Sequence, residues 1–369
     1  MRKTLISTAF LLFSINAVAD PLDKFKTIKG EVPGCAVAII KGDSIVNEQY
    51  YGYSNLSYLI KNDEKTTFNI GSISKHMTAA IFFRLEQDGV FNRSDLLSKY
   101  YPTGPKWFKK ITIGQLLTHE SGLPDYLNDP MLSGASLAEL AKDLESVLGL
   151  LEDRPIANYT IVSTVLKALK DYSKLEFEPG SEARYSNTGY LLLADIIENN
   201  SEKTFKQWLN FYILDPYEMN NTSVHNYLSR DIKWTAVAYT ETKYNSGNYK
   251  GSVGKLLEIG DGGILTTIKD YSKWMIALKN STDPESPWHG FLPNPEKDHT
   301  SEVDNLRYQN GLNIFSPDGH VYSHSGRSID GMDSTMWIYP KQDIAYIQLC
   351  NYMDPINVNM SDIVLAYLK

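Results

Sequence analysis

The sequence predicts an α/β protein of the α+β type, in which one antiparallel sheet built from both ends of the chain encloses a mainly helical domain. Strand-like stretches lie near the two ends, and helical periodicity dominates the residues between them. A sheet completed by both ends of a chain leaves the middle to fold as a second layer. We expect residues 20–71 and 255–369 to form the sheet-containing domain and residues 72–254 the helical one.

Length and composition agree with a globular protein of one or two domains. The chain has 369 residues, of which 42% are hydrophobic and 22% are charged. Lys and Arg number 36 against 44 Asp and Glu, which gives a net charge of −8. Because a protein that follows nucleic-acid phosphates needs a basic surface, this balance disfavours nucleic acid as a partner.

The first nineteen residues have the pattern of a secretory signal peptide. Arg2 and Lys3 precede an apolar stretch over residues 5–15, and small residues lead to a cleavage site after Ala19. The apolar stretch is shorter than the roughly 18 to 20 residues that a transmembrane helix needs, and no other stretch approaches that length. We therefore expect a secreted or periplasmic protein without a transmembrane segment.

Short apolar runs bounded by turn residues define the expected strands. Residues 34–40 and 44–51 flank a Lys-Gly-Asp turn and predict a β-hairpin. Three further strands are expected near the other end of the chain, at residues 320–325, 332–339 and 344–351. The segment 354–369 after them is expected to be helical.

Apolar residues in the middle of the chain recur at helical spacing. The expected helices are residues 72–88, 137–151, 161–169, 189–198, 205–214 and 268–279.

Two cysteines, Cys35 and Cys350, lie near opposite ends of the chain. They could form one long-range disulfide in an oxidising compartment, or remain two buried thiols that behave as small hydrophobic side chains. Cys35 begins the first expected strand and Cys350 ends the last, and antiparallel neighbours bring a start beside an end. We therefore expect the two residues on adjacent strands.

The first chemical candidate is Ser72 with Lys75, at the start of an expected helix. Free N–H groups there favour a developing negative charge, and residues three apart share a helix face. A lysine without its hydration can take the serine proton if its pKa falls. The alternative is a capping serine beside a solvated lysine. A second pair of this spacing, Ser252 and Lys255, starts no amphipathic helix.

The second candidate is Tyr185 with Asn187, in a loop expected between rigid elements. In an extended segment the two side chains point the same way, so that a phenol for proton transfer lies beside an amide for a substrate carbonyl. The spacing alone identifies nothing, because Tyr-x-Asn also starts at Tyr53, Tyr126 and Tyr308.

The third candidate is the triplet His324, Ser325 and Gly326 on an expected strand. A glycine lets a ligand approach the backbone, and the two side chains before it offer donors. The next N–H, that of Arg327, can complete an oxyanion hole with the N–H of Ser72. The alternative is a solvent-facing histidine before a turn.

Together, Ser-x-x-Lys, Tyr-x-Asn and His-Ser-Gly resemble, in this order, the motifs of the serine β-lactamase and penicillin-binding protein superfamily. The most similar branch, of the S12 serine hydrolase type, holds class C β-lactamases, D-alanyl-D-alanine carboxypeptidases, D-aminopeptidases and related esterases. Residues 33–37, 116–124 and 262–265 also resemble this branch, and we interpret them as structural, His119 included. The resemblance implies a five-stranded antiparallel sheet flanked by helices, with the active site between it and the helical domain.

The resemblance also assigns roles to the candidate residues. The implied catalytic residues are Ser72 as the acylated nucleophile and Lys75 and Tyr185 as the proton-transfer pair. The implied substrate-binding residues are Asn187, His324, Ser325, Gly326 and Arg327. The chain lacks the His-Glu-x-x-His and phosphate-binding glycine motifs, so neither a metal nor another cofactor is expected.

His324 occupies the place where class C β-lactamases carry the lysine of Lys-Thr-Gly, and this resembles the carboxypeptidases and esterases. A histidine is only partly charged near neutral pH, so a fixed cation for a β-lactam carboxylate is missing unless Arg327 supplies it. We expect an exported hydrolase of the D-alanyl-D-alanine carboxypeptidase or related D-amino-acid peptidase type, with peptidoglycan stem peptides among its substrates. The alternatives are a β-lactamase or esterase of this fold, or a non-catalytic penicillin-binding or cell-wall sensing module.

Overall fold

The computed structural model describes residues 20–129, 156–224, 234–241, 247–252, 259–294, 301–303, 306–315, 320–328, 331–353, 356 and 358–367. The expected signal peptide, the expected helix over residues 137–151 and Lys255 lie outside these described residues.

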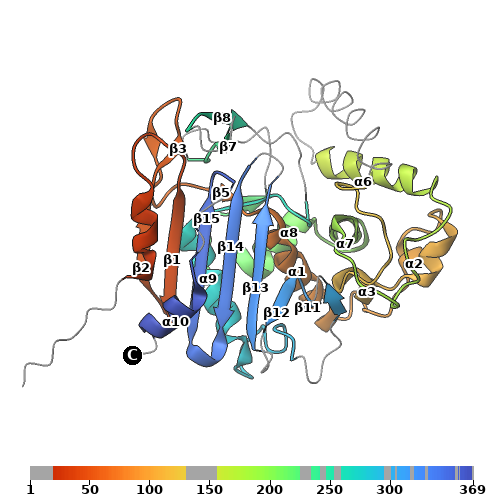
Figure 1. The fold of residues 1–369 in the computed structure, drawn as a ribbon. Coiled ribbons are helices and arrows are strands. Elements are labelled where there is room, and N and C mark those ends of the chain that lie inside the picture. Colours follow the sequence, from red (N-terminus) through yellow and green to blue (C-terminus); the bar gives the residue numbers. More distant parts are fainter. Residues whose placement is uncertain are drawn as a thin grey trace, which may run out of the picture.

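Both ends of the chain meet in one antiparallel sheet (Figure 1). Its strands, in order across the sheet, are β10 (Ser301–Val303), β11 (Leu306–Gln309), β12 (Leu312–Phe315), β13 (Val321–Arg327), β14 (Asp333–Tyr339), β15 (Ile344–Cys350), β1 (Cys35–Lys41) and β2 (Ser44–Tyr50). The expected hairpin and the three expected C-terminal strands are confirmed. The expected count of five strands is wrong, because three short strands between residues 301 and 315 extend the sheet beyond β13.

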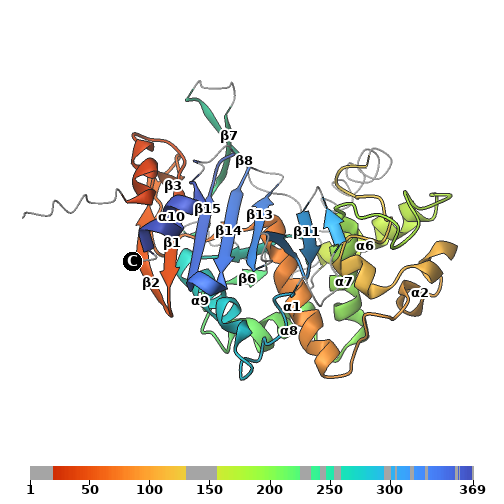
Figure 2. The same ribbon diagram turned by 60° about the horizontal axis from the view of Figure 1, so that its bottom comes forward.

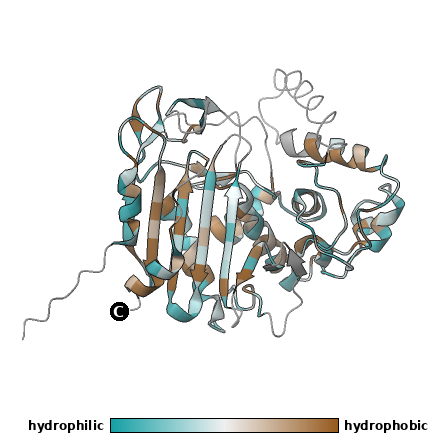
Figure 3. Ribbon diagram, in the orientation of Figure 1, coloured by the Kyte–Doolittle hydropathy of each residue, from teal (hydrophilic) through white to brown (hydrophobic). Residues whose placement is uncertain are grey.

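Helices cover both faces of this sheet. Side chains alternate between the faces along a strand, so β1 can be buried along its length only if both faces are covered. Ala38 lies in the large core on the face where α9 (Ile268–Lys279) packs. Val37 lies in a smaller core with η1 (Pro21–Thr27) and α10 (Met360–Tyr367). In Figure 3, β1 is hydrophobic, whereas β13, which carries the His-Ser-Gly triplet, is mostly hydrophilic.

Most of the remaining helices come from the middle of the chain. They are η2 (Gly71–Ile73), α1 (Ser74–Gln87), α2 (Leu97–Tyr100), η3 (Lys106–Lys110), α3 (Ile113–Leu117), α6 (Ile156–Leu169), α7 (Asn187–Asn200), α8 (Phe205–Leu209) and the π-helical η4 (Asn210–Leu214). The α1 helix packs on α7 and α8, and α7 packs on α3 and α6. Figures 1 and 2 show α1, α8 and α9 under one face of the sheet and α2, α3, α6 and α7 beyond its β11 end.

The helices expected at residues 161–169, 189–198 and 268–279 are confirmed, and the one expected at 205–214 is divided between α8 and η4. The expected C-terminal helix is confirmed as the shorter α10. Smaller elements complete the described part: η6 (Asn280–Thr282), η7 (Pro340–Gln342), β3 (Tyr53–Asn55), β4 (Ile60–Lys61), β5 (Phe68–Asn69), β6 (Ser223–Val224), β7 (Ala238–Glu241), β8 (Tyr249–Ser252) and β9 (Ile264–Thr266). The division into two domains stays a prediction.

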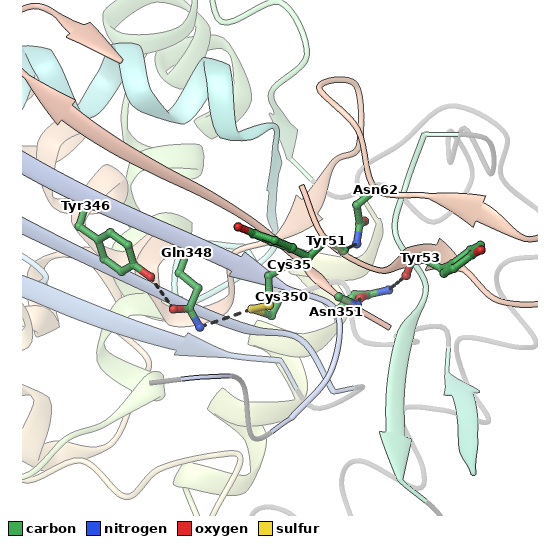
Figure 4. The surroundings of a disulfide bond; sticks show 9 residues. Cys35, Tyr51, Tyr53, Asn62, Tyr346, Gln348, Cys350 and Asn351 are labelled. Carbon is green, nitrogen blue, oxygen red and sulfur yellow. Dashed lines mark hydrogen bonds between the residues drawn. A yellow bond between two sulfur atoms is a disulfide. The ribbon is translucent and has the colours of Figure 1, made fainter. Parts of the chain in front are cut away.

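A disulfide joins Cys35 and Cys350, which pair directly across β1 and β15 with Cα atoms 4.1 Å apart. The expectation that the two cysteines lie on adjacent strands is confirmed. Figure 4 shows Gln348 beside the bond, with its amide donating to the Cys350 sulfur at 3.5 Å and its oxygen accepting from the Tyr346 hydroxyl at 2.7 Å. The bond fastens the first strand to the last, across a separation of 315 residues.

No helix in the described ranges has the length and apolar character needed to cross a membrane. The same residues contain no group of three or more His, Cys, Asp or Glu side chains that could hold a metal ion.

Candidate active site

Ser72 lies in the 3-10 turn η2, immediately before α1, and not in the first turn of an α-helix as expected. The turn is shaped by Gly71, which has a φ of +52° and whose N–H donates to the Asn69 side chain at 2.9 Å. A Cβ on Gly71 would lie 2.9 Å from the backbone of Arg327. The α-helix therefore begins two residues after the nucleophile candidate, because η2 is packed directly against β13.

Lys75 is fully buried, and its ammonium group makes three hydrogen bonds. Its Nζ donates to Ser72 Oγ at 3.0 Å, to Asn187 Oδ1 at 2.7 Å and to the carbonyl oxygen of Asp261 at 2.7 Å. An ammonium has three N–H donors and an uncharged amine has two. The two permanent acceptors can hold both donors of the neutral amine, which leaves its lone pair facing the Ser72 hydroxyl.

Asn187 is the first residue of α7, and not part of a loop before a helix as expected. The residue before it, Ser186, is still extended, with φ −142° and ψ 117°. The Asn187 amide donates to both carboxylate oxygens of Asp125, at 2.9 and 3.2 Å, while its oxygen accepts from Lys75. The helix start therefore places this amide between a carboxylate and the candidate base.

Tyr185 lies beside Lys75, whose Nζ is 4.9 Å from the centroid of the phenol ring. The ring also packs against His119, with centroids 4.5 Å apart. His119 accepts a hydrogen bond from the Ser186 N–H at 3.3 Å through Nδ1. Burial is the main cause that keeps the pKa of His119 well below its ordinary value, and the positive charge of Lys75 is the second cause. An uncharged histidine therefore supports the backbone that carries Tyr185.

His324 is buried, with its Nε2 3.3 Å from the Tyr308 hydroxyl and its Nδ1 2.5 Å from the carbonyl oxygen of Ser325. Burial, and secondly the charge of Lys75, lower the pKa of His324 to about 3. The expectation that His324 is partly charged near neutral pH is therefore wrong.

The rest of the triplet departs from expectation in one respect. Gly326 is buried, and a Cβ on it would lie 1.9 Å from the carbonyl oxygen of Ile70, so this glycine admits the chain that leads into η2 and not a ligand. Ser325 is exposed and lines a cavity of about 340 Å³ beside Trp337. Arg327 is also exposed, and its Nε donates to the Asp333 carboxylate at 2.8 Å.

The structure thus joins Ser72, Lys75 and Asn187 by hydrogen bonds and places Tyr185 against Lys75. The competing Ser252 lies on the short strand β8.

Comparison with known proteins identifies the family of the chain. A model of the family described as Beta-lactamase matches residues 15–367. The chain belongs to the beta-lactamase family. Its fold is that of beta-lactamases and penicillin-binding proteins.

Three similar proteins share 19 to 24% of their residues with this chain. Protein Flp of Staphylococcus aureus strain MW2 is 24% identical over 338 residues, which cover 88% of this chain and 60% of Flp. The octameric penicillin-binding protein homologue of Pyrococcus abyssi has a TM-score of 0.72 at 23% identity, over 94% of this chain and 75% of that one. A D-stereospecific amidohydrolase from Streptomyces sp. has a TM-score of 0.67 at 19% identity, over 94% and 98% of the two chains. The chain thus spans about 60% of the length of Flp.

The motifs alone do not identify four residues of the site: Asp125, Tyr126, Asp261 and Tyr308. Tyr126 and Tyr308 start two of the Tyr-x-Asn triplets that carry no weight by spacing. Asp125 and Asp261 directly adjoin the stretches 116–124 and 262–265, whose likeness to this family is the signal that could have found them.

Proposed function

We propose that this family member is an exported serine hydrolase that forms an acyl-enzyme on Ser72 and acts on D-alanyl-D-alanine peptides or related D-amino-acid peptides. The observation that supports this most is the contact of the Ser72 hydroxyl with a fully buried lysine whose other donors are held by Asn187 and Asp261. Such a contact is what a serine nucleophile and its base need.

In the proposed reaction, the Ser72 oxygen attacks the substrate carbonyl while its proton passes to Lys75, with Tyr185 as the second member of the proton-transfer pair. The N–H groups of Ser72 and Arg327 would stabilise the oxyanion. The leaving amine receives the proton and departs. Water then attacks the ester on Ser72, which releases the acid product and restores the free serine.

Export is part of the proposal. Residues 1–19 have the pattern of a signal peptide, and the disulfide between Cys35 and Cys350 is of a kind that persists in oxidising compartments.

An esterase of the same fold is the second candidate, and the state of His324 favours it. Because His324 is uncharged at neutral pH, the triplet has no lysine-like cation for a substrate carboxylate, and Arg327 already donates to Asp333. If the protein is a carboxypeptidase, it therefore depends on Arg327 to bind the substrate carboxylate, whereas an esterase does not.

Matched peptides that end in D-Ala-D-Ala acid or amide distinguish the two candidates. For a carboxypeptidase, we expect Arg327→Ala to lower kcat/KM about tenfold or more on the acid and little on the amide, since a charge-assisted contact contributes about 1.5 to 3 kcal/mol. The preference for the acid should stay constant from pH 5 to 8, because His324 is neutral throughout. Equal losses on both peptides would count against recognition of the carboxylate and favour the esterase.

A further inference from the structure

Asp261 is a buried carboxyl group that the reaction above uses only through its backbone. It is 1% exposed, and its carbonyl oxygen accepts from Lys75 Nζ. Its Oδ2 accepts a hydrogen bond from the Tyr126 hydroxyl at 2.8 Å. Its Oδ1 has no hydrogen-bond partner among the described residues. A half-satisfied carboxyl group in the interior is costly and therefore invites a functional explanation.

The position of Asp261 is fixed by contacts with α1. The carbonyl oxygen of Gly260 accepts from the Thr78 hydroxyl at 2.7 Å, and the Ile264 N–H donates to the Ser74 hydroxyl at 3.2 Å. Gly260 has a φ of +99°, and a Cβ on it would lie 2.7 Å from the carbonyl oxygen of Tyr190. These contacts hold the segment against the start of α1, where the Asp261 carbonyl oxygen binds Lys75 Nζ and the charge of Lys75 acts on the carboxyl group.

The ionisable groups that act on this carboxyl come from two parts of the chain. Lys75 comes from α1, and Asp125 and Tyr126 come from the segment between α3 and α6. On α7, the ring of Tyr190 lies 5.8 Å from Lys75 Nζ. Lys75 is the basic member of this set, and Asp125 is held by Asn187.

We propose that Asp261 is a positioning residue whose carboxylate acts through Lys75, by stabilising the ammonium that forms when Lys75 accepts the Ser72 proton. This inference rests on the proposed function. In the step, the proton leaves Ser72 Oγ for Lys75 Nζ as the bond from Oγ to the substrate carbonyl carbon forms. Asp261 neither gains nor loses a proton, and the ammonium later protonates the leaving group.

The carboxylate can act in this way only while it is ionised. Burial raises the pKa of Asp261 to about 6, against the opposing effects of the Lys75 charge and the Tyr126 hydrogen bond. The rate of acylation should therefore fall as the pH decreases through about 6, when the buried carboxyl takes up a proton.

The experiment measures the acylation rate of Ser72 from pH 5 to 8 by rapid-quench mass spectrometry, with p-nitrophenyl acetate as the probe. In the wild type we expect the rate to fall about tenfold toward pH 5, with a midpoint near 6. The acylation rate of the Asp261→Asn variant should show no midpoint and should stay, at all pH values, at the low rate that the wild type has near pH 5. Tyr126→Phe removes a hydrogen bond that favours the charged form, so its midpoint should move above 6. Asp270→Asn removes another buried aspartate, on α9, and should leave the midpoint unchanged.

The outcomes separate this inference from the proposed function. A wild type that forms no adduct on Ser72 overturns both. Suppose the wild type forms the adduct. If Asp261→Asn then keeps the wild-type midpoint, or slows acylation by the same factor at every pH, the inference alone is overturned, because a purely structural role would give either result. A midpoint that Tyr126→Phe leaves unmoved or shifts downward also contradicts it.

Discussion

Among single residues, Asn187 shows how the site fixes the direction of an amide. A carboxylate can only accept hydrogen bonds, so the two oxygens of Asp125 must face the NH₂ end of the Asn187 side chain. The oxygen end is then directed to Lys75 at 2.7 Å. Asp125 thereby orients a partner of the candidate base.

Replacement of Asp125 by alanine should release this amide. We expect Asp125→Ala to slow acylation about tenfold or more, since hydrogen bonds to a charged group contribute about 1.5 to 3 kcal/mol and 1.4 kcal/mol corresponds to a factor of ten. The measurement is the single-turnover acylation rate at pH 8. Asp283→Ala is the control. Asp125 accepts the backbone N–H of Leu127, and Asp283 accepts that of Glu285 in the same way, in an exposed turn. Equal rates in the two variants would show that the orientation of Asn187 does not matter.

The motifs suffice to select Ser72, Lys75, Tyr185 and Asn187, and the structure brings these four residues together. The same reasoning cannot select Tyr126 or Tyr308, because their importance arises from tertiary contacts. Tyr126 meets Asp261 across 135 residues, and Tyr308 meets His324 on a neighbouring part of the sheet. Nor can sequence show that His324 is uncharged, because that depends on its burial.

Among elements, the contact between η2 and β13 positions the nucleophile. Gly71 and Gly326 face this contact, and neither has room for a Cβ. A 3-10 turn is shorter and less regular than a helix, so helical periodicity alone predicts the helix start two residues early. Likewise, β10, β11 and β12 have only three or four residues each, which is too short for an alternating pattern to be recognised.

Gly326→Ala should disturb this contact. Its Cβ would lie 1.9 Å from the Ile70 carbonyl oxygen, which belongs to backbone and cannot rotate away. We expect the free energy of unfolding to fall by about 1 to 3 kcal/mol and acylation of Ser72 to fall by a larger factor than stability alone explains. Gly189→Ala in α7, whose Cβ would be 3.4 Å from its nearest neighbour, should have little effect in urea unfolding and in acylation assays. A fully active, stable Gly326→Ala variant would contradict the role of the contact.

At the scale of the molecule, three buried histidines among the described residues link stability to pH. Burial lowers the pKa of His76 and of His324 to about 3, and that of His119 well below its ordinary value. Each is neutral when folded and takes up a proton on unfolding once the pH is below about 6.5. A lowered pKa in the folded state contributes stability above the unfolded pKa, and this stability is lost as the pH falls. The contribution of Asp261 to the pH dependence of stability has the opposite sign, since its pKa is raised in the folded state.

The free energy of unfolding should therefore decrease between pH 6 and 4. Each histidine contributes a slope of up to about 1.4 kcal/mol per pH unit. Asp261 and Asp195, whose pKa burial also raises, each oppose them by up to the same amount, so we expect a net slope of about 1 to 3 kcal/mol per unit. Urea unfolding at several pH values measures it. His76→Asn should reduce the slope, whereas exposed His289→Gln should not. A stability that stays constant over this range would show that the histidines are not buried in the neutral form.

Ser72 is expected to carry the acyl group, and intact-protein mass spectrometry followed by peptide mapping detects this adduct. The wild type is mixed with benzylpenicillin or with a D-Ala-D-Ala peptide and quenched over time. We expect an adduct on the peptide that contains Ser72, no adduct in Ser72→Ala, and an unchanged adduct in Ser252→Ala. The time course then distinguishes a hydrolase, whose adduct decays, from a module that stays acylated. An adduct of comparable yield in Ser72→Ala would show that another residue carries the acyl group.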